Sequence, residues 1–308
     1  MGNRRATARM LSLVESNSPQ ARQALAALYP HTGRAHIVGI TGPPGSGKST
    51  LAFAAAKALR AGGQTVGIVA VDPSSPFSGG ALLGDRIRMQ ELSRDEGVFI
   101  RSMASRGHYG GLALATGDAV KVLDASGLQV ILVETVGAGQ GEVEIARQAH
   151  TTIVVEAPGL GDEIQAIKAG LFEIADIFVV NKADRVGADA AVAALKSMLS
   201  LSDAPTGDGW KPPVLKTVAT REEGISALLD AMTAHWAYLQ GSGERQLRDR
   251  RRGEEELRRA LGAELLQRTL VRVDAQLWEG LLEEIAQRQI DPHAAAERLL
   301  ESYPMLER

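Results

Sequence analysis

The residues most able to do chemistry in this 308-residue chain are those at positions 42–50, which read GPPGSGKST. They match the G-x-x-x-x-G-K-[ST] pattern of a phosphate-binding loop, and they stand between the apolar stretch HIVGI and the helical pattern KSTLAFAAAKALR. Gly42, Gly45 and Gly47 let the backbone turn its amides around phosphate oxygens, and the start of the helix adds partial positive charge. We therefore expect a nucleoside triphosphate to bind here.

Individual residues of this loop have separate expected roles. Lys48 would reach the β- and γ-phosphates, and the Ser49 hydroxyl would bind Mg²⁺. A Gly-rich turn without a ligand is the alternative, but the pattern and its context both favour the phosphate loop. The residues predicted to surround the phosphates are Gly42, Pro43, Pro44, Gly45, Ser46, Gly47, Lys48, Ser49 and Thr50.

Three acidic residues stand where ligands of a magnesium ion are usually found. Asp72 ends the apolar run VAVD, Asp85 lies in the Gly-rich segment SGGALLGDR, and Glu134 ends the apolar run VILVE. A carboxylate at the carboxyl end of a buried strand faces the crevice where open α/β sheets bind ligands. Helix capping or a turn is the alternative role of each. The predicted metal ligands are Ser49, Asp72, Asp85 and Glu134.

A second motif bears on the base of the nucleotide. The run DIFVVNKAD places Asn181, Lys182 and Asp184 directly after an apolar stretch. A carboxylate can accept from both N1–H and the 2-amino group of guanine. Adenine offers neither donor, and leaving the carboxylate oxygens unpaired would cost about 1–3 kcal/mol. The Lys182 stem would lie along the base, and Asn181 would tie this loop to the phosphate end. With the phosphate loop, this N-K-x-D pattern predicts GTP and GDP as ligands.

Two further segments are candidates for contact with the guanine carbonyl and the γ-phosphate. The run PVLKTVATREEGI places Val218, Ala219 and Thr220 where backbone amides would face the carbonyl. In ETVGAGQGE, the Gly137 amide would reach the γ-phosphate, and Gln140 is a candidate for positioning water. A surface polar residue in a flexible loop is an equal alternative for Gln140. The candidate catalytic residues are Lys48, Glu134 and Gln140.

Other loops are candidates for rearrangement when the γ-phosphate leaves. ETVGAGQGE and VDPSSPFSGGALLGDRIRM have the glycine content and position of switch segments. A third loop, APGLGDEIQAIKAG, breaks a strand at Pro158 and Gly159 and starts a helix at Asp162, for which a strand-to-helix turn is the ordinary role. The residues of IRSMASRGHYGG to which we assign no chemistry are Arg101, Arg106 and His108.

Elements of secondary structure must position these residues, and the sequence indicates an α/β fold. Short apolar, β-branched runs alternate with helical patterns, which is typical of a mainly parallel sheet covered by helices on both faces. Ahead of the sheet, Ser18 and Pro19 are typical of an N-cap and first helical position. The runs predicted as strands are AHIVGI, TVGIVAV, VFIRS, LQVILVE, TTIVVEA, DIFVVN and PVLKTVA.

The composition changes after about Gly241, where the run GSGERQLRDRRRGEEELRRALGAELLQR is dense in charged residues and interrupted by glycines. Trp278, Leu281, Leu282 and Ile285 share one face of a predicted helix, and Asp291 is typical of the N-cap of a last one. The charge run is most often a solvated helix face, with a partner or dimer surface as the alternative. We expect a helical extension at 1–34, a phosphate-loop domain at 35–240 and a helical arm at 241–308.

Composition and charge exclude several classes of protein. With 44% apolar residues the chain can form a sizeable core, and its net charge of −3 gives no basic surface for nucleic acid or a membrane. Cysteine is absent, which excludes disulfides and thiolate metal sites. No apolar run reaches the length of a secretory segment or a membrane span. These features predict a soluble cytoplasmic protein.

Taken together, the motifs carry a family resemblance. The segments HTGRAHIVGITGPPGSGKSTL, VDPSSPFSGGALLGDRIRM, FIRSMASRGHYGGLALAT, VETVGAGQGEVEIA, PGLGDEIQAIKAGLFEIADIFVVNKAD and WKPPVLKTVA closely resemble the MeaB/ArgK/MMAA family of G proteins. The similarity runs from about His31 to Gly224. Glu134 stands where most G proteins have Asp, as in this family.

The resemblance implies a GTPase that acts as a chaperone of adenosylcobalamin-dependent acyl-CoA mutases, of the methylmalonyl-CoA mutase kind. Such proteins gate cofactor loading and protect the mutase from inactivation. The resemblance also implies a homodimer formed through the C-terminal arm, and a third switch from Pro158 to Lys168 that includes Asp162.

Two other functions are weighed against this one. A nickel-insertion GTPase needs soft or imidazole ligands, whereas the chain has no Cys and six His without an obvious cluster. A small-molecule or protein kinase of a transport system needs an acceptor base and pocket, for which we find neither a motif nor a spacing. A nucleotide-binding module without turnover is a third alternative.

Overall fold

A computed structural model describes residues 3–15, 18–72, 92, 94–104, 111–135, 148–159, 169–201 and 209–302. The contacts among them divide the chain into two compact units, Met1–Arg245 and Gln246–Arg308. The first unit contains the sheet and every described residue of the predicted nucleotide site.

The first unit is built on a seven-stranded sheet in the order β3-β2-β4-β1-β5-β6-β7, and each pair of neighbouring strands is parallel. Each of the seven predicted runs forms one strand, which confirms the predicted sheet. The strands are β1 (His36–Thr41), β2 (Val66–Asp72), β3 (Val98–Ala104), β4 (Val130–Thr135), β5 (Thr151–Glu156), β6 (Ile177–Val180) and β7 (Val214–Lys216).

The central strands are mostly apolar and are buried along their whole length, because helices cover both faces of the sheet. All residues of β1, β4, β5 and β6 are buried, as expected for parallel strands without a solvent face. Side chains alternate between two separate cores: Val38 and Ile40 lie in one, and Ile37 lies in the other. The sheet is therefore the middle layer of three.

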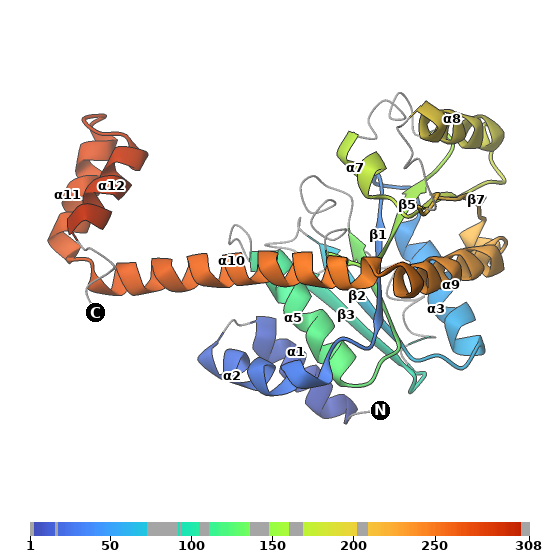
Figure 1. Cartoon of the computed structure of the whole chain (residues 1–308), viewed down its shortest axis with the longest axis horizontal. Coiled ribbons are helices and arrows are strands. Elements are labelled where there is room, and N and C mark those ends of the chain that lie inside the picture. The colour runs from blue at the N-terminus through green and yellow to red at the C-terminus, as the bar shows by residue number, and fades with distance from the viewer. Residues whose placement is uncertain are drawn as a thin grey trace. The chain divides into compact units, whose positions relative to one another are not determined.

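Different helices cover the two faces (Figure 1). α3 (Lys48–Ala61) and α9 (Ile225–Ser242) pack together on the face that carries Val38 and Ile40. On the opposite face, α1 (Arg4–Glu15) and α2 (Pro19–Leu28) pack against α5 (Gly111–Ala125). α8 (Ala188–Leu201) and the short α7 (Ala169–Ile174) join a third core with β6.

The start of the chain forms two helices before the sheet. Ser18 Oγ accepts from the Ala21 amide at 3.2 Å and Pro19 begins α2, which confirms the predicted cap. The preceding helix α1 lies within the extension predicted as helical at 1–34 but was not singled out from the sequence; its Leu11 and Val14 are buried in the core. Its stability comes from this packing more than from its sequence, as is usual for helices of this length.

The second unit consists of helices joined by short turns in its described residues 246–302. α10 (Glu244–Arg272) leads into α11 (Ala275–Ala286) and α12 (Pro292–Ser302), which pack around Leu281, Ala295 and Leu299. Asp291 Oδ1 accepts from the His293 amide at 2.8 Å, which confirms the predicted N-cap. In the described residues, no helix has both the length and the apolar character required to cross a membrane.

Candidate nucleotide-binding site

The phosphate loop joins β1 to α3, and its glycines lie where other residues would not fit. Gly42 has φ +136°, and a Cβ there would stand 2.1 Å from the Val155 carbonyl oxygen. Gly47 has φ +91°, and a Cβ there would stand 2.4 Å from Asn181 Nδ2. Both values lie in the left-handed region that glycine tolerates. The loop is therefore held tightly between β5 and the loop after β6.

Two polar groups of this loop face inward. Lys48 Nζ donates to the carbonyl oxygens of Gly42 at 2.7 Å and Pro43 at 2.9 Å, and the residue is only 6% exposed. Ser46 Oγ is buried and has no hydrogen-bond partner among the described residues. A buried hydroxyl without a partner costs about 1–3 kcal/mol, which is more typical of a ligand site than of a purely structural turn.

One predicted pair of metal ligands is brought together. Ser49 lies in the first turn of α3, and Glu134 lies near the carboxyl end of β4, which is adjacent to β1. The Ser49 hydroxyl donates to Glu134 Oε1, and Glu134 is buried. A hydroxyl and a carboxylate are hard oxygen donors of the kind that Mg²⁺ prefers, so this pair fits the ion. The backbone of Asp72 ends β2, a neighbour of β4.

Asn181 joins three segments of the site. Its Nδ2 donates to the Ser46 carbonyl oxygen at 2.9 Å, and its Oδ1 accepts from Thr217 Oγ1 and from the Ala219 amide, both at 3.1 Å. The side chain is 2% exposed. Both hydrogen bonds accepted by its carboxamide oxygen thus come from groups within the protein. Asn181 connects the phosphate loop to both loops predicted to contact guanine.

The other two residues of the N-K-x-D motif lie beside Asn181 but are more exposed. Lys182 adopts φ +54° and its Nζ donates to the Gly45 carbonyl oxygen at 2.6 Å, so the side chain extends over the phosphate loop. Asp184 lies 3.5 Å from Arg221 Nη2, and its side chain is 46% exposed. This exposed carboxylate is available to a base.

The loop after β7 differs in detail from the prediction. Ala219–Arg221 forms a 3₁₀ turn. The Val218 amide donates to the Glu223 carbonyl oxygen at 3.0 Å, and the Ala219 amide donates to Asn181 Oδ1. Of the three amides predicted to face the guanine carbonyl, these two already have acceptors within the protein.

Several predicted residues lie outside the part of the chain that the structure describes, or only their backbone is described. For Asp72, the structure describes the backbone alone. Arg101, which had no assigned chemistry, lies in β3 and its Nε donates to Glu15 Oε1 at 2.7 Å, so it ties α1 to the sheet. Those outside the described residues are Asp85, Arg106, His108, Gly137, Gln140, Asp162 and Lys168.

The structure gathers three histidines that are far apart in the sequence, where we had expected no histidine cluster. His36 Nε2 is hydrogen-bonded to Thr151 Oγ1 at 2.7 Å, and the same oxygen to His235 Nδ1 at 2.9 Å. His150 lies beside them, with its ring centroid 6.4 Å from that of His36. No group of three or more histidine and acidic side chains in the described residues is arranged to hold a metal ion.

Burial controls the charge of this cluster. Burial, together with smaller contributions from the neighbouring His150 and His235, lowers the pKa of His36 from 6.5 to about 3. His36 is therefore neutral at pH 7. It also stacks on Trp236, with ring centroids 4.4 Å apart.

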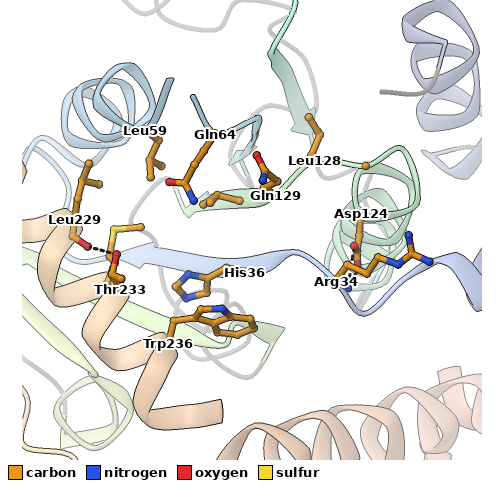
Figure 2. Close-up of a pocket in the computed structure, with 13 residues that line it drawn as sticks. Arg34, His36, Leu59, Gln64, Asp124, Leu128, Gln129, Leu229, Thr233 and Trp236 are labelled. Carbon is orange, nitrogen blue, oxygen red and sulfur yellow. Dashed lines mark hydrogen bonds between the residues drawn. The ribbon is translucent and has the colours of Figure 1, made fainter. Parts of the chain in front are cut away.

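A cavity of about 440 Å³ lies next to His36 and Trp236 (Figure 2). His36 and Val130 begin β1 and β4, so the cavity lies at the amino end of the strands, whereas the phosphate loop follows the carboxyl end of β1. Leu59 and Leu229 line one part of it and Arg34 another. It is separate from the predicted nucleotide site.

Comparison with known proteins identifies the family. The family described as "Methylmalonyl Co-A mutase-associated GTPase MeaB" matches residues 7–274. The chain belongs to the MeaB family of GTPases. This confirms the resemblance inferred from the motifs, and the match extends beyond the sheet on both sides.

Relatives of this MeaB family member are similar over most of their length. A GTPase-family protein from Pyrococcus abyssi is 52% identical over 300 residues, which cover 97% of this chain and 93% of that protein. GTPase ArgK from Escherichia coli is 38% identical, covering 86% and 82%. The crystal structure of an LAO/AO transport system kinase has a TM-score of 0.73 at 30% identity, covering 97% and 93%.

Proposed function

We propose that this protein binds GTP and GDP with Mg²⁺ and hydrolyses GTP. The observation that carries the proposal is the position of Asn181, whose side chain connects the phosphate loop at Ser46 to the loop of Ala219. This connection brings the motif for phosphate and the motif for guanine to one edge of the sheet. Membership of a GTPase family supports the same function.

Recognition of guanine would depend on Asp184. Its carboxylate is half-exposed beside Arg221, and the Lys182 side chain of the same motif lies over the phosphate loop. Two donors of guanine would pair with the two oxygens, whereas adenine has no such donors. Thr220 would supply the amide for the guanine carbonyl.

The phosphates would occupy the loop from Gly42 to Thr50. Lys48 now donates to two loop carbonyls, and phosphate oxygens would take over as acceptors of its charged hydrogen bonds. Ser49 and Glu134 would hold Mg²⁺, with Asp72 and Asp85 as the remaining candidates. Bound magnesium neutralises the charge that develops on the phosphate oxygens. Gln140 or a partner would position water, and Gly137 would bind the γ-phosphate.

The partner that the family description suggests is an acyl-CoA mutase that depends on adenosylcobalamin. GTP and GDP would favour different arrangements of three loops, at 71–89, 137–141 and 158–168, and these arrangements would set the affinity for the mutase. A nucleotide that bound both arrangements with equal affinity would not shift the equilibrium between them. In this proposal the protein is a cytoplasmic chaperone that gates cofactor loading.

Domain organisation follows the same proposal. Residues 35–240 would form the GTPase domain, 1–34 a helical extension, and 241–308 an arm through which two copies dimerise. The described part of the arm carries exposed apolar side chains such as Leu257, Leu261 and Trp278, which is consistent with a surface that a partner covers.

The decisive experiment for nucleotide specificity is calorimetry with GDP, GTP, ADP and ATP in the presence of Mg²⁺. We expect measurable binding of the guanine nucleotides alone. Asp184→Asn should shift preference towards xanthine nucleotides, because an amide reverses one of the two hydrogen bonds. Equal affinity for ATP and GTP would contradict the proposal.

Two assays distinguish hydrolysis from its alternatives. Release of labelled phosphate to water from [γ-³²P]GTP supports a GTPase, and transfer to any other acceptor supports the kinase that one solved relative is named for. Pull-down of an adenosylcobalamin-dependent mutase from a native extract tests the chaperone. It should be stronger in one nucleotide state than in the other.

A further inference from the structure

Arg221 lies beside the carboxylate that the proposed function assigns to guanine. Arg221 Nη2 is 3.5 Å from Asp184 Oδ2, and Arg221 Nε is 3.1 Å from Glu223 Oε1. No sequence motif pointed to this residue. We propose that Arg221 is a positioning residue, which holds the Asp184 carboxylate in the orientation that reads guanine.

The backbone that carries Arg221 is fixed on several sides. The residue ends the 3₁₀ turn Ala219–Arg221, and its amide donates to the Val218 carbonyl oxygen at 2.9 Å. Val218 and Glu223 form an antiparallel bridge behind it. The loop therefore has little freedom to move Arg221 away from Asp184.

Two further contacts tie this loop to the rest of the site. Glu222, with φ +59°, is paired with Lys57 from α3, the helix that the phosphate loop opens. Gly224 has φ +76°, and a Cβ there would stand 2.2 Å from the Lys216 carbonyl oxygen. The position of Arg221 is thus linked to the same helix that would hold the phosphates.

The chemistry of the pair is suited to positioning. A carboxylate has about four acceptor sites on its two oxygens, and a guanidinium occupies part of them while leaving the others for a ligand. The pair is half-exposed, with side chains 54% and 46% exposed for Arg221 and Asp184. Such a pair contributes little by itself. A bound base that covers this pair would lower the local dielectric and so strengthen the electrostatic interaction between Arg221 and Asp184.

The inference rests on the proposed function, so the test measures discrimination as well as affinity. IDP lacks the 2-amino group of GDP, and the ratio of the two affinities reports how well Asp184 is oriented. We expect Arg221→Ala to weaken GDP binding about 3- to 10-fold and to weaken IDP binding less. Arg221→Lys should restore part of the affinity, because it keeps the charge without the planar fork.

Arg185→Ala is the matched control. Arg185 is exposed and follows Asp184 directly. Its replacement by alanine removes the same charge as Arg221→Ala, but among the described residues the ion pair of Asp184 is with Arg221 and not with Arg185. It should leave the ratio of GDP to IDP affinity unchanged. A double-mutant cycle adds a second criterion: Arg221→Ala should have no effect on GDP binding in an Asp184→Ala background, because it acts through that carboxylate.

The outcomes separate the two proposals. If the unaltered protein binds IDP as tightly as GDP, the proposed reading of guanine by Asp184 is wrong. If the unaltered protein prefers GDP but Arg221→Ala weakens GDP and IDP equally, or not at all, the role of Arg221 is wrong while guanine specificity stands. An effect of Arg185→Ala equal to that of Arg221→Ala would also overturn it, since net charge alone would then explain the change.

Discussion

The Asn181 carboxamide donates to the Ser46 carbonyl oxygen at 2.9 Å, across 135 positions of sequence. The same side chain accepts from the Ala219 amide. Because Asn181 is 2% exposed, water does not readily replace the hydrogen bonds that it makes with these groups. One buried side chain therefore fixes the position of the phosphate loop relative to the loops proposed to bind guanine.

Asn181→Ala should both destabilise the first unit and weaken GDP binding. It leaves the Thr217 hydroxyl, the Ala219 amide and the Ser46 carbonyl without their partner, and we expect a loss of about 1–3 kcal/mol in the free energy of unfolding. Urea denaturation and calorimetry with GDP measure the two effects. Asp189→Asn, which breaks an exposed pair with Lys216, is the control and should change stability by less than about 1 kcal/mol. Equal effects of the two variants would contradict the bridging role.

Gly42→Ala should be much more damaging than an alanine at another glycine with positive φ. Gly63 has φ +81° with nothing near its Cβ position, whereas a Cβ at Gly42 would meet the Val155 carbonyl oxygen. Gly63→Ala therefore reports backbone strain alone, about 1 kcal/mol. Gly42→Ala adds a steric clash, and we expect a larger loss of stability together with loss of GDP binding. Thermal unfolding with and without GDP measures both, and similar melting temperatures for the two variants would show that the loop is not tightly held.

Ser49→Ala should make nucleotide binding insensitive to Mg²⁺. The hydroxyl donates to Glu134 in this structure, and the proposed site uses both oxygens as ligands. GDP affinity should rise with Mg²⁺ in the unaltered protein and rise much less in Ser49→Ala, while affinities in EDTA stay similar. Thr233→Ala removes a hydroxyl that donates only to the Leu229 carbonyl oxygen of α9 and should keep the full magnesium effect. The same magnesium effect in Ser49→Ala would remove Ser49 from the ligand set.

Mild acid should destabilise the first unit through His36. Its pKa is lowered from 6.5 to about 3 in the folded protein, chiefly by burial. The unfolded chain therefore binds a proton between these values while the folded chain does not, so stability present above pH 6.5 is lost as the pH falls towards 3. Between pH 7 and pH 5 the free energy of unfolding should fall by about 2 kcal/mol because of His36.

His36→Gln should remove this part of the pH dependence. Urea denaturation at pH 7 and pH 5 gives the change in unfolding free energy for each variant. His31→Gln, at an exposed position, serves as the control and should retain the slope of the unaltered protein. A His36→Gln slope equal to that of the unaltered protein would show that His36 is protonated equally in both states.

Much of the fold could be predicted because its signals are local. Runs such as VILVE and DIFVVN are mostly apolar, since parallel strands are buried on both sides, and caps such as Ser18 act within three residues. The bounds of the helix α1, within the predicted helical extension, were not given by the sequence because packing of Leu11 and Val14 in the core stabilises it. The pairing of Ser49 with Glu134 was expected only in outline, from the rule that strand ends meet at one edge.

The sequence by itself determined the phosphate loop, the N-K-x-D motif and the number of strands, because each of these depends on residue types at short, fixed spacing. The tertiary structure alone decided the strand order, the joining of His36, His150 and His235, and the approach of Arg221 to Asp184. The histidine and arginine contacts join residues that are 37 to 199 positions apart, and the strand pairs join residues at least 24 positions apart. The free energy of such contacts depends on how whole layers pack, which no local pattern records.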